Sequence, residues 1–81
     1  MDLSPHAQDM LRDRKIPEAW VWATVSGPDA KELKAHRDGR DHYFRYIAEA
    51  GGKWLHVVVD STVSPSVVVT VFFDRRLGRN P

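Results

Sequence analysis

Basic and aromatic side chains alternate with apolar residues in the second half of the chain, and their types suit the cleavage of RNA. Tyr43 and Arg45 share one predicted strand, and His56 lies in the next. Arg75 and Arg76 follow the last strand. Such a set could cleave RNA without a metal, because the 2′-hydroxyl is the nucleophile, a base takes its proton and arginines stabilise the phosphorane.

This chemistry makes a geometric prediction. Arg45 and His56 alternate with apolar neighbours, so we expect both to face the same side of the sheet, away from the helices, as catalytic residues. Tyr43, Arg75 and Arg76 are the predicted RNA-binding residues. The alternative is a solvated strand face, since arginine and histidine occur on the exposed strands of most small domains.

The histidines of the chain do not indicate a metal centre. The chain has four, His6, His36, His42 and His56, and none has metal-ligand spacing with another histidine or an acidic residue. The sequence also lacks a glycine-rich phosphate loop and the strand–turn–helix motif of a nucleophilic serine. We therefore predict neither a metal nor a cofactor.

Length and composition favour one small domain over residues 1–81. The net charge is only +1. The chain has no cysteine, and this absence fits a reducing cytoplasm. No apolar run approaches the roughly 18 residues of a membrane span, so we expect no membrane partner. Residues 74–81 are basic and should fray unless Arg75 and Arg76 are tied down.

The predicted elements that must position these residues form an α+β fold. Ser4 and Pro5 begin a helix to about Lys15, and a second helix runs from Pro17 to about Ser26. Alternating patterns then predict a weak strand over 32–36 and clear strands over 41–49 and 53–60. The stretch 67–73 is apolar on both faces and predicts a last strand that is central or well covered. We predict two short helices packed on one face of a three- to four-stranded antiparallel sheet.

Three residues of the helical half have two readings. Arg14 ends the apolar stripe of the first helix, so it either extends past the helix end or reaches a carboxylate or phosphate at the sheet. Trp20 and Trp22 are about 200° apart on the second helix and cannot both face one core. At least one should be partly exposed, either covering the edge of the core or anchoring a partner.

Several short motifs resemble domain of unknown function 4258. They are Ser4-Pro5-His6-Ala7, Arg12-Asp13-Arg14-Lys15-Ile16, Pro28-Asp29, Leu55-His56-Val57-Val58-Val59 and Val68-Val69-Thr70-Val71-Phe72. The family tends to begin with a Ser-x-His-Ala helix and a Glu-Arg-Gly-Ile segment. Met10 stands where the family often has arginine, and Lys15 where it has glycine, so an arginine of the relatives is either lost here or replaced by Arg14 or Lys15.

That family is similar in fold to the RelE-like and BrnT-like toxins of type II toxin–antitoxin modules. The resemblance implies a bacterial cytoplasmic ribonuclease that acts on RNA or on the ribosome and is held inactive by a cognate antitoxin. It adds His6 and Arg14, as motif positions, to the catalytic set of Arg45 and His56. The alternative is a non-catalytic interaction module, or a homodimer, that binds its partner through Trp20 or Trp22 and a strand edge.

Overall fold

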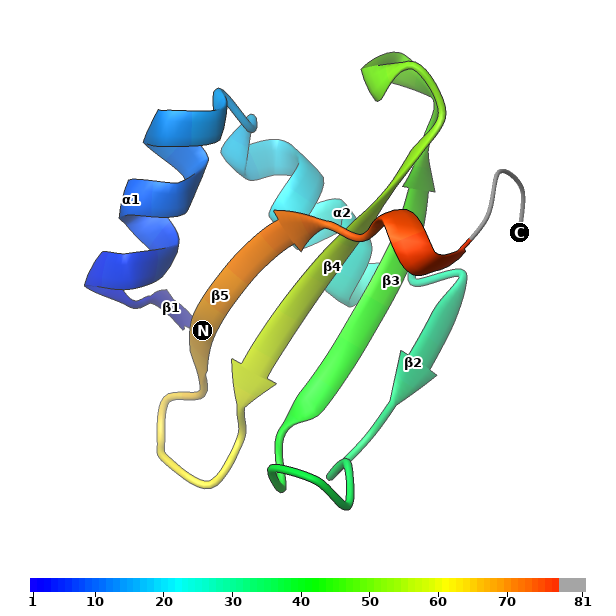
Figure 1. Cartoon of the computed structure of the whole chain (residues 1–81). Coiled ribbons are helices and arrows are strands. Elements are labelled where there is room, and N and C mark those ends of the chain that lie inside the picture. The colour runs from blue at the N-terminus through cyan, green and yellow to red at the C-terminus, as the bar shows by residue number, and fades with distance from the viewer. Residues whose placement is uncertain (78–81) are drawn as a thin grey trace.

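The protein places two helices on one face of a five-stranded sheet (Figure 1). The structure, a computed structural model, describes residues 1–77. The helices are α1 (Pro5–Arg14) and α2 (Glu18–Ser26), and the strands are β1 (Asp2–Leu3), β2 (Ala30–Glu32), β3 (Asp41–Ile47), β4 (Lys53–Asp60) and β5 (Val67–Phe73). Two 3-10 turns, η1 (Ala48–Ala50) and η2 (Arg75–Leu77), follow β3 and β5.

The predicted α+β class is confirmed, but the predicted sheet was too small and too uniform. The strand order is β1-β5-β4-β3-β2, and β1 runs parallel to β5 whereas the other pairs are antiparallel. The strand expected over 32–36 is wrong, because β2 ends at Glu32 and Lys34 adopts a left-handed conformation. Residues 33–40 instead form a loop.

Both predicted helices form, and local signals explain where they begin and end. The Ser4 hydroxyl accepts a hydrogen bond from the amide of Ala7, so it caps α1, and Pro5 occupies the first turn. Lys15 ends that helix in the left-handed region, and Gly27 ends α2. Among the described residues, no helix has the length and apolar character needed to cross a membrane.

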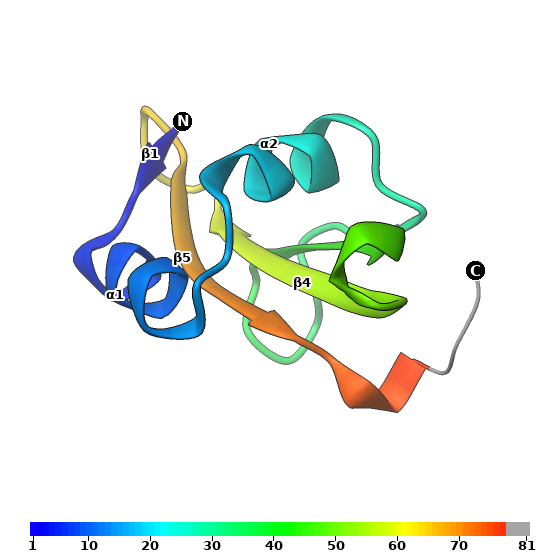
Figure 2. The same cartoon turned by 90° about the horizontal axis from the view of Figure 1, so that it is seen from above.

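The apolar core lies between the helices and one face of the sheet (Figure 2). Helix α1 packs against β5, and α2 packs against β3 and β4. The largest fully buried side chains include Val21, Leu55, Val57 and Val71. Strand β5 lies between β1 and β4 and is apolar on both faces, because Val71 is buried in the core whereas Phe72 packs on the ring of His56 on the outer face.

The hairpin from β3 to β4 contains two consecutive glycines with the same positive φ angle. Gly51 and Gly52 both have φ of 78°, a value that side chains other than glycine rarely adopt. Their surroundings differ. A Cβ at Gly51 would meet open space, but a Cβ at Gly52 would overlap the hydroxyl of Tyr46. This close approach fixes the end of the sheet at which β4 begins.

We therefore expect Gly52→Ala to destabilise the protein more than Gly51→Ala does. Both changes cost about 1–2 kcal/mol for the left-handed backbone, and only Gly52→Ala must also displace Tyr46. Urea denaturation of the two variants measures the difference. Equal losses in the free energy of unfolding would show that the Tyr46 contact does not constrain the hairpin.

Candidate functional site

The sheet face away from the helices carries a buried pair of histidines. In the β3–β4 register, Phe44 lies opposite His56 and His42 lies opposite Val58, so the two imidazoles are diagonal neighbours on one face. Only 4% of His42 and 2% of His56 is exposed. The rings of Phe44 and Phe72 cover His56, with centroids 4.2 and 4.6 Å away.

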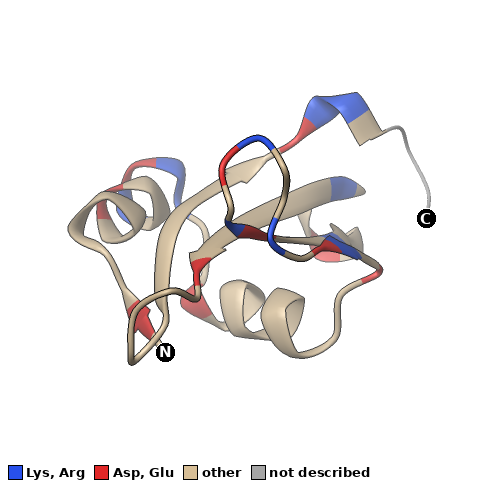
Figure 3. Cartoon of the chain, turned by 90° about the horizontal axis from the view of Figure 1, so that it is seen from below, with Lys and Arg blue, Asp and Glu red and all other residues tan. Residues whose placement is uncertain are grey.

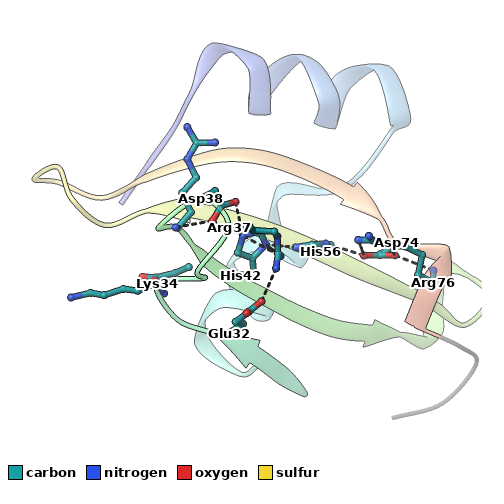
Figure 4. A network of polar contacts seen from close by, with 10 residues as sticks. Glu32, Lys34, Arg37, Asp38, His42, His56, Asp74 and Arg76 are labelled. Atoms are coloured by element: carbon teal, nitrogen blue, oxygen red, sulfur yellow. Dashed lines mark hydrogen bonds and ion pairs between the residues drawn. The ribbon is translucent and has the colours of Figure 1, made fainter.

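A continuous chain of polar contacts runs through this pair (Figure 4). His42 Nε2 lies 2.9 Å from Asp38 Oδ2, and His42 Nδ1 lies 2.7 Å from His56 Nε2. On the other side, His56 Nδ1 lies 3.0 Å from Asp74 Oδ2. The chain therefore connects the 33–40 loop to the residue that follows β5.

Asp74 is the best-connected residue of the site. Its carboxylate accepts two hydrogen bonds from the Arg76 guanidinium, at 3.0 and 2.8 Å, and one from the Arg76 amide. These bonds hold the pKa of Asp74 well below its ordinary value, although burial opposes them. The main-chain amide of Asp74 donates to the carbonyl of Trp54, which ties η2 to the start of β4.

Burial lowers the pKa of His56, and the positive charges of His42 and Arg76 act in the same direction. The hydrogen bond to Asp74 opposes the shift. The imidazole of His56 is therefore neutral near pH 7. Both of its nitrogens are engaged, one with His42 and one with Asp74, so the ring is a structural connector.

A pocket of about 450 Å³ opens beside Asp74, where α1 ends, β4 begins and β5 ends. Three cationic side chains line it, and each comes from a different element: Arg14, Lys53 and Arg75. Trp54 and Phe73 form its aromatic part, and Lys53 Nζ lies 5.5 Å from the centre of the Phe73 ring. Figure 3 shows the basic residues of η2 at this end of the sheet. The pocket is therefore suited to an anion.

The structure brings only part of the predicted catalytic set together. Arg14 lines the pocket, and His56 adjoins it through Asp74. His6 is exposed near the first turn of α1, eight residues before Arg14 and therefore about 12 Å away along the helix axis. Arg45 also lies outside the residues that line the pocket.

The prediction that Arg45 and His56 share a face is wrong. Arg45 lies opposite Leu55, a core residue, so its side chain is on the helix side of the sheet. There its guanidinium donates to the carbonyl of Gly27, at the end of α2. The two strands do alternate as expected, but the register across the hairpin gives Arg45 and His56 opposite faces.

The predicted binding residues have mixed positions. Tyr43 packs half-buried against the core, where burial raises its pKa. Arg75 lines the pocket, and Arg76 is held by Asp74, so this part of the basic segment is tied down. The rest of the predicted basic tail, residues 78–81 with Arg79, lies outside the described residues.

Both tryptophans of α2 are half-buried, as at least one was expected to be. Trp20 meets Phe73 edge-on, with ring centroids 6.5 Å apart. The indole nitrogen of Trp22 donates to Glu18 on the same helix.

Sequence reasoning missed four residues of the site: His42, Lys53, Trp54 and Asp74. His42 could have been found by aligning β3 and β4 across the Gly51-Gly52 turn, which puts it beside His56. Asp74 carries no such signal, because it follows the last strand outside any periodic pattern. Within residues 1–77, no group of three histidine or acidic side chains is arranged to hold a metal ion.

Asp74 gives the site a testable dependence on pH. A carboxyl whose pKa is lowered by folding stabilises the protein above the unfolded-state value, about 3.9, and this stabilisation is lost as the pH falls. At pH 7 we expect Asp74→Asn to lower the free energy of unfolding by about 1–3 kcal/mol, because the variant lacks the charged acceptor.

The difference from the wild type should narrow below about pH 4, where the Asp74 stabilisation is being lost in the wild type as well. Urea denaturation at pH 7 and below about pH 4 measures the difference in the free energy of unfolding between the variant and the wild type. Asp9→Asn, at an exposed ion pair on α1, is the control and should have little effect. A difference that stays constant with pH would show that Asp74 is not held as a carboxylate.

Comparison with known proteins identifies a family but no characterised relative. The family model described as Domain of unknown function (DUF4258) matches residues 3–73. No curated protein and no solved structure matches the chain.

Proposed function

Because the chain belongs to the domain of unknown function 4258 family, whose description names no activity, we propose a function from the site itself. We propose that it is a toxin-type endoribonuclease whose pocket binds the phosphodiester backbone of RNA. The observation that carries the proposal is the convergence of Arg14, Lys53 and Arg75, from three separate elements, on one pocket.

The charge balance of the pocket supports an anionic ligand. Its one carboxylate, Asp74, is already paired with Arg76 and does not cancel the other cations. Arginine forms paired hydrogen bonds with phosphate, and lysine adds a compact charge. Trp54 also lines the pocket, and its indole nitrogen has no acceptor among the described residues. That nitrogen is itself buried, so it offers no donor to a ligand, and Trp54 contributes to the pocket as part of its aromatic wall.

The same cations could promote cleavage. In a 2′-hydroxyl attack the RNA supplies the nucleophile. Its proton passes to solvent, the bond from phosphorus to the 5′ oxygen breaks, and that oxygen takes a proton from solvent, so the protein must chiefly stabilise the charge that builds up on the phosphorane. Arg14, Lys53 and Arg75 would do this. The buried ring of His56 does not reach a substrate, so we assign it the placement of Asp74 and not the role of general base.

The toxin assignment also implies a setting. We propose a cytoplasmic protein that a cognate antitoxin covers, with Trp20, Trp22 and the short edge strand β2 as the proposed contacts. A catalytic role for His6 rests on the family resemblance alone, since its helix turn lies far from the pocket.

The second candidate is a non-catalytic module that binds RNA or a protein partner. One observation favours it. The only histidine connected to the pocket is buried with both nitrogens engaged, so no imidazole among residues 1–77 is offered to a substrate there. Binding without cleavage would support this candidate.

We expect Arg14→Ala, Lys53→Ala and Arg75→Ala each to weaken the binding of single-stranded RNA. Each lost phosphate contact should reduce the slope of log affinity against log salt by about 0.7. Arg12→Ala and Lys31→Ala are matched controls, because both residues are exposed and lie outside the pocket. Fluorescence anisotropy at several salt concentrations measures the slope, and equal effects in pocket and control variants would contradict the proposal.

The same variants should lose cleavage of total RNA or of messenger RNA on translating ribosomes. A substrate with 2′-deoxy nucleotides should remain intact, because the nucleophile is missing. His6→Ala, tested in parallel, separates the role implied by the family resemblance from that of the pocket. Wild-type protein that binds RNA through the pocket but cleaves in neither setting would leave the interaction module as the better account.

A further inference from the structure

The contacts of the two buried histidines require more protons than two neutral rings carry. Asp38 lies at one end of the pair and Asp74 at the other, and each accepts a hydrogen from the nearer imidazole. That uses the one N–H of each neutral ring. The remaining nitrogens, His42 Nδ1 and His56 Nε2, are 2.7 Å apart and would then face each other with two lone pairs.

The carboxylates cannot supply the missing hydrogen. A backbone hydrogen bond from Arg40 is the main cause that lowers the pKa of Asp38, and Arg76 lowers that of Asp74. Both are ionised near neutral pH and only accept. The three contacts of the line, to Asp38, between the rings and to Asp74, are therefore all hydrogen bonds only when the two imidazoles carry three protons.

The charged groups around the histidine pair carry a net charge that one extra proton would neutralise. His42 faces Asp38 and Arg37 from the loop, and Arg37 is paired with Glu32 of β2. His56 faces Asp74, which is paired with Arg76. The two arginines and three carboxylates sum to one negative charge, and one imidazolium neutralises the cluster.

We propose that His42 and His56 share one proton in the folded protein, and that this proton makes them the residues that position Asp74 at the pocket. His42 carries the proton and donates from both nitrogens, to Asp38 and to His56. His56 is neutral and donates to Asp74. The pair thus links the 33–40 loop to η2 through one unbroken line of hydrogen bonds.

The proposal gives the protein a maximum of stability with respect to pH. As the pH falls below about 6.5, the two histidines of the unfolded chain take up two protons. The folded pair keeps only one, because the lowered pKa of His56 opposes a second. The unfolded state then binds more protons, so the free energy of unfolding decreases. As the pH rises and the shared proton leaves, the lone pairs repel and stability decreases again. The maximum lies where the pair holds one proton.

Nitrogen-15 NMR of the imidazoles in the wild-type protein tests the proton directly. Near pH 7 we expect one ring with both nitrogens protonated and one with hydrogen on Nδ1 alone, and this pattern should be lost in a single step as the pH rises. Two neutral rings near pH 7 would overturn the proposal. The measurement needs neither a variant nor RNA.

The positioning role has a second readout, and this part rests on the proposed function. RNA affinity should fall as the proton leaves, by about tenfold once nine in ten molecules have lost it. His42→Gln should remove this dependence, whereas His36→Gln, at an exposed histidine of the same loop, should behave as the wild type does. An RNA affinity that stays constant while the histidine pair loses its proton would overturn the positioning role. A shared proton without any RNA binding would count against the proposed function alone.

Discussion

Two histidines buried on the outer face of the sheet must find hydrogen-bond partners, and this requirement organises the end of the molecule at which the pocket lies. A buried polar group left unpaired costs about 1–3 kcal/mol. The cost is avoided because Asp38 approaches from the loop and Asp74 from the end of β5. Both segments are irregular, and the histidine pair holds them against the regular strands β3 and β4, together with the main-chain bond from Asp74 to Trp54.

The two faces of the sheet consequently have different tasks. The helix side holds the apolar core, and even its arginine, Arg45, is used to satisfy the end of α2. The outer side holds the polar chain, whose last member orients η2. The pocket forms where the two sides meet, because α1 ends there on one side and η2 begins on the other. The proposed anion site at this junction combines residues that neither face supplies alone.

The sequence predicts those parts of the fold that local signals determine. Ser4 and Pro5 mark the first helix, alternation gives β4, and an apolar run gives β5, both strands with the bounds found in the structure. Strand β1 has two residues and no period, so only its pairing with β5 creates it. The site was harder to predict, because it depends on register. Arg45 and His56 look alike in their own strands, yet the hairpin pairs Phe44 with His56 and places Arg45 on the helix side of the sheet.

The central claim is that the basic pocket binds RNA phosphate, and an NMR titration tests it most directly. Isotope-labelled protein is titrated with a short RNA in which every 2′-hydroxyl is methylated, so that binding occurs without cleavage. We predict that the largest shift changes fall on the amides of Gly52, Lys53 and Arg75 and on the guanidinium of Arg14. Changes centred on the β2 edge or on α2, or no changes at all, would contradict the account.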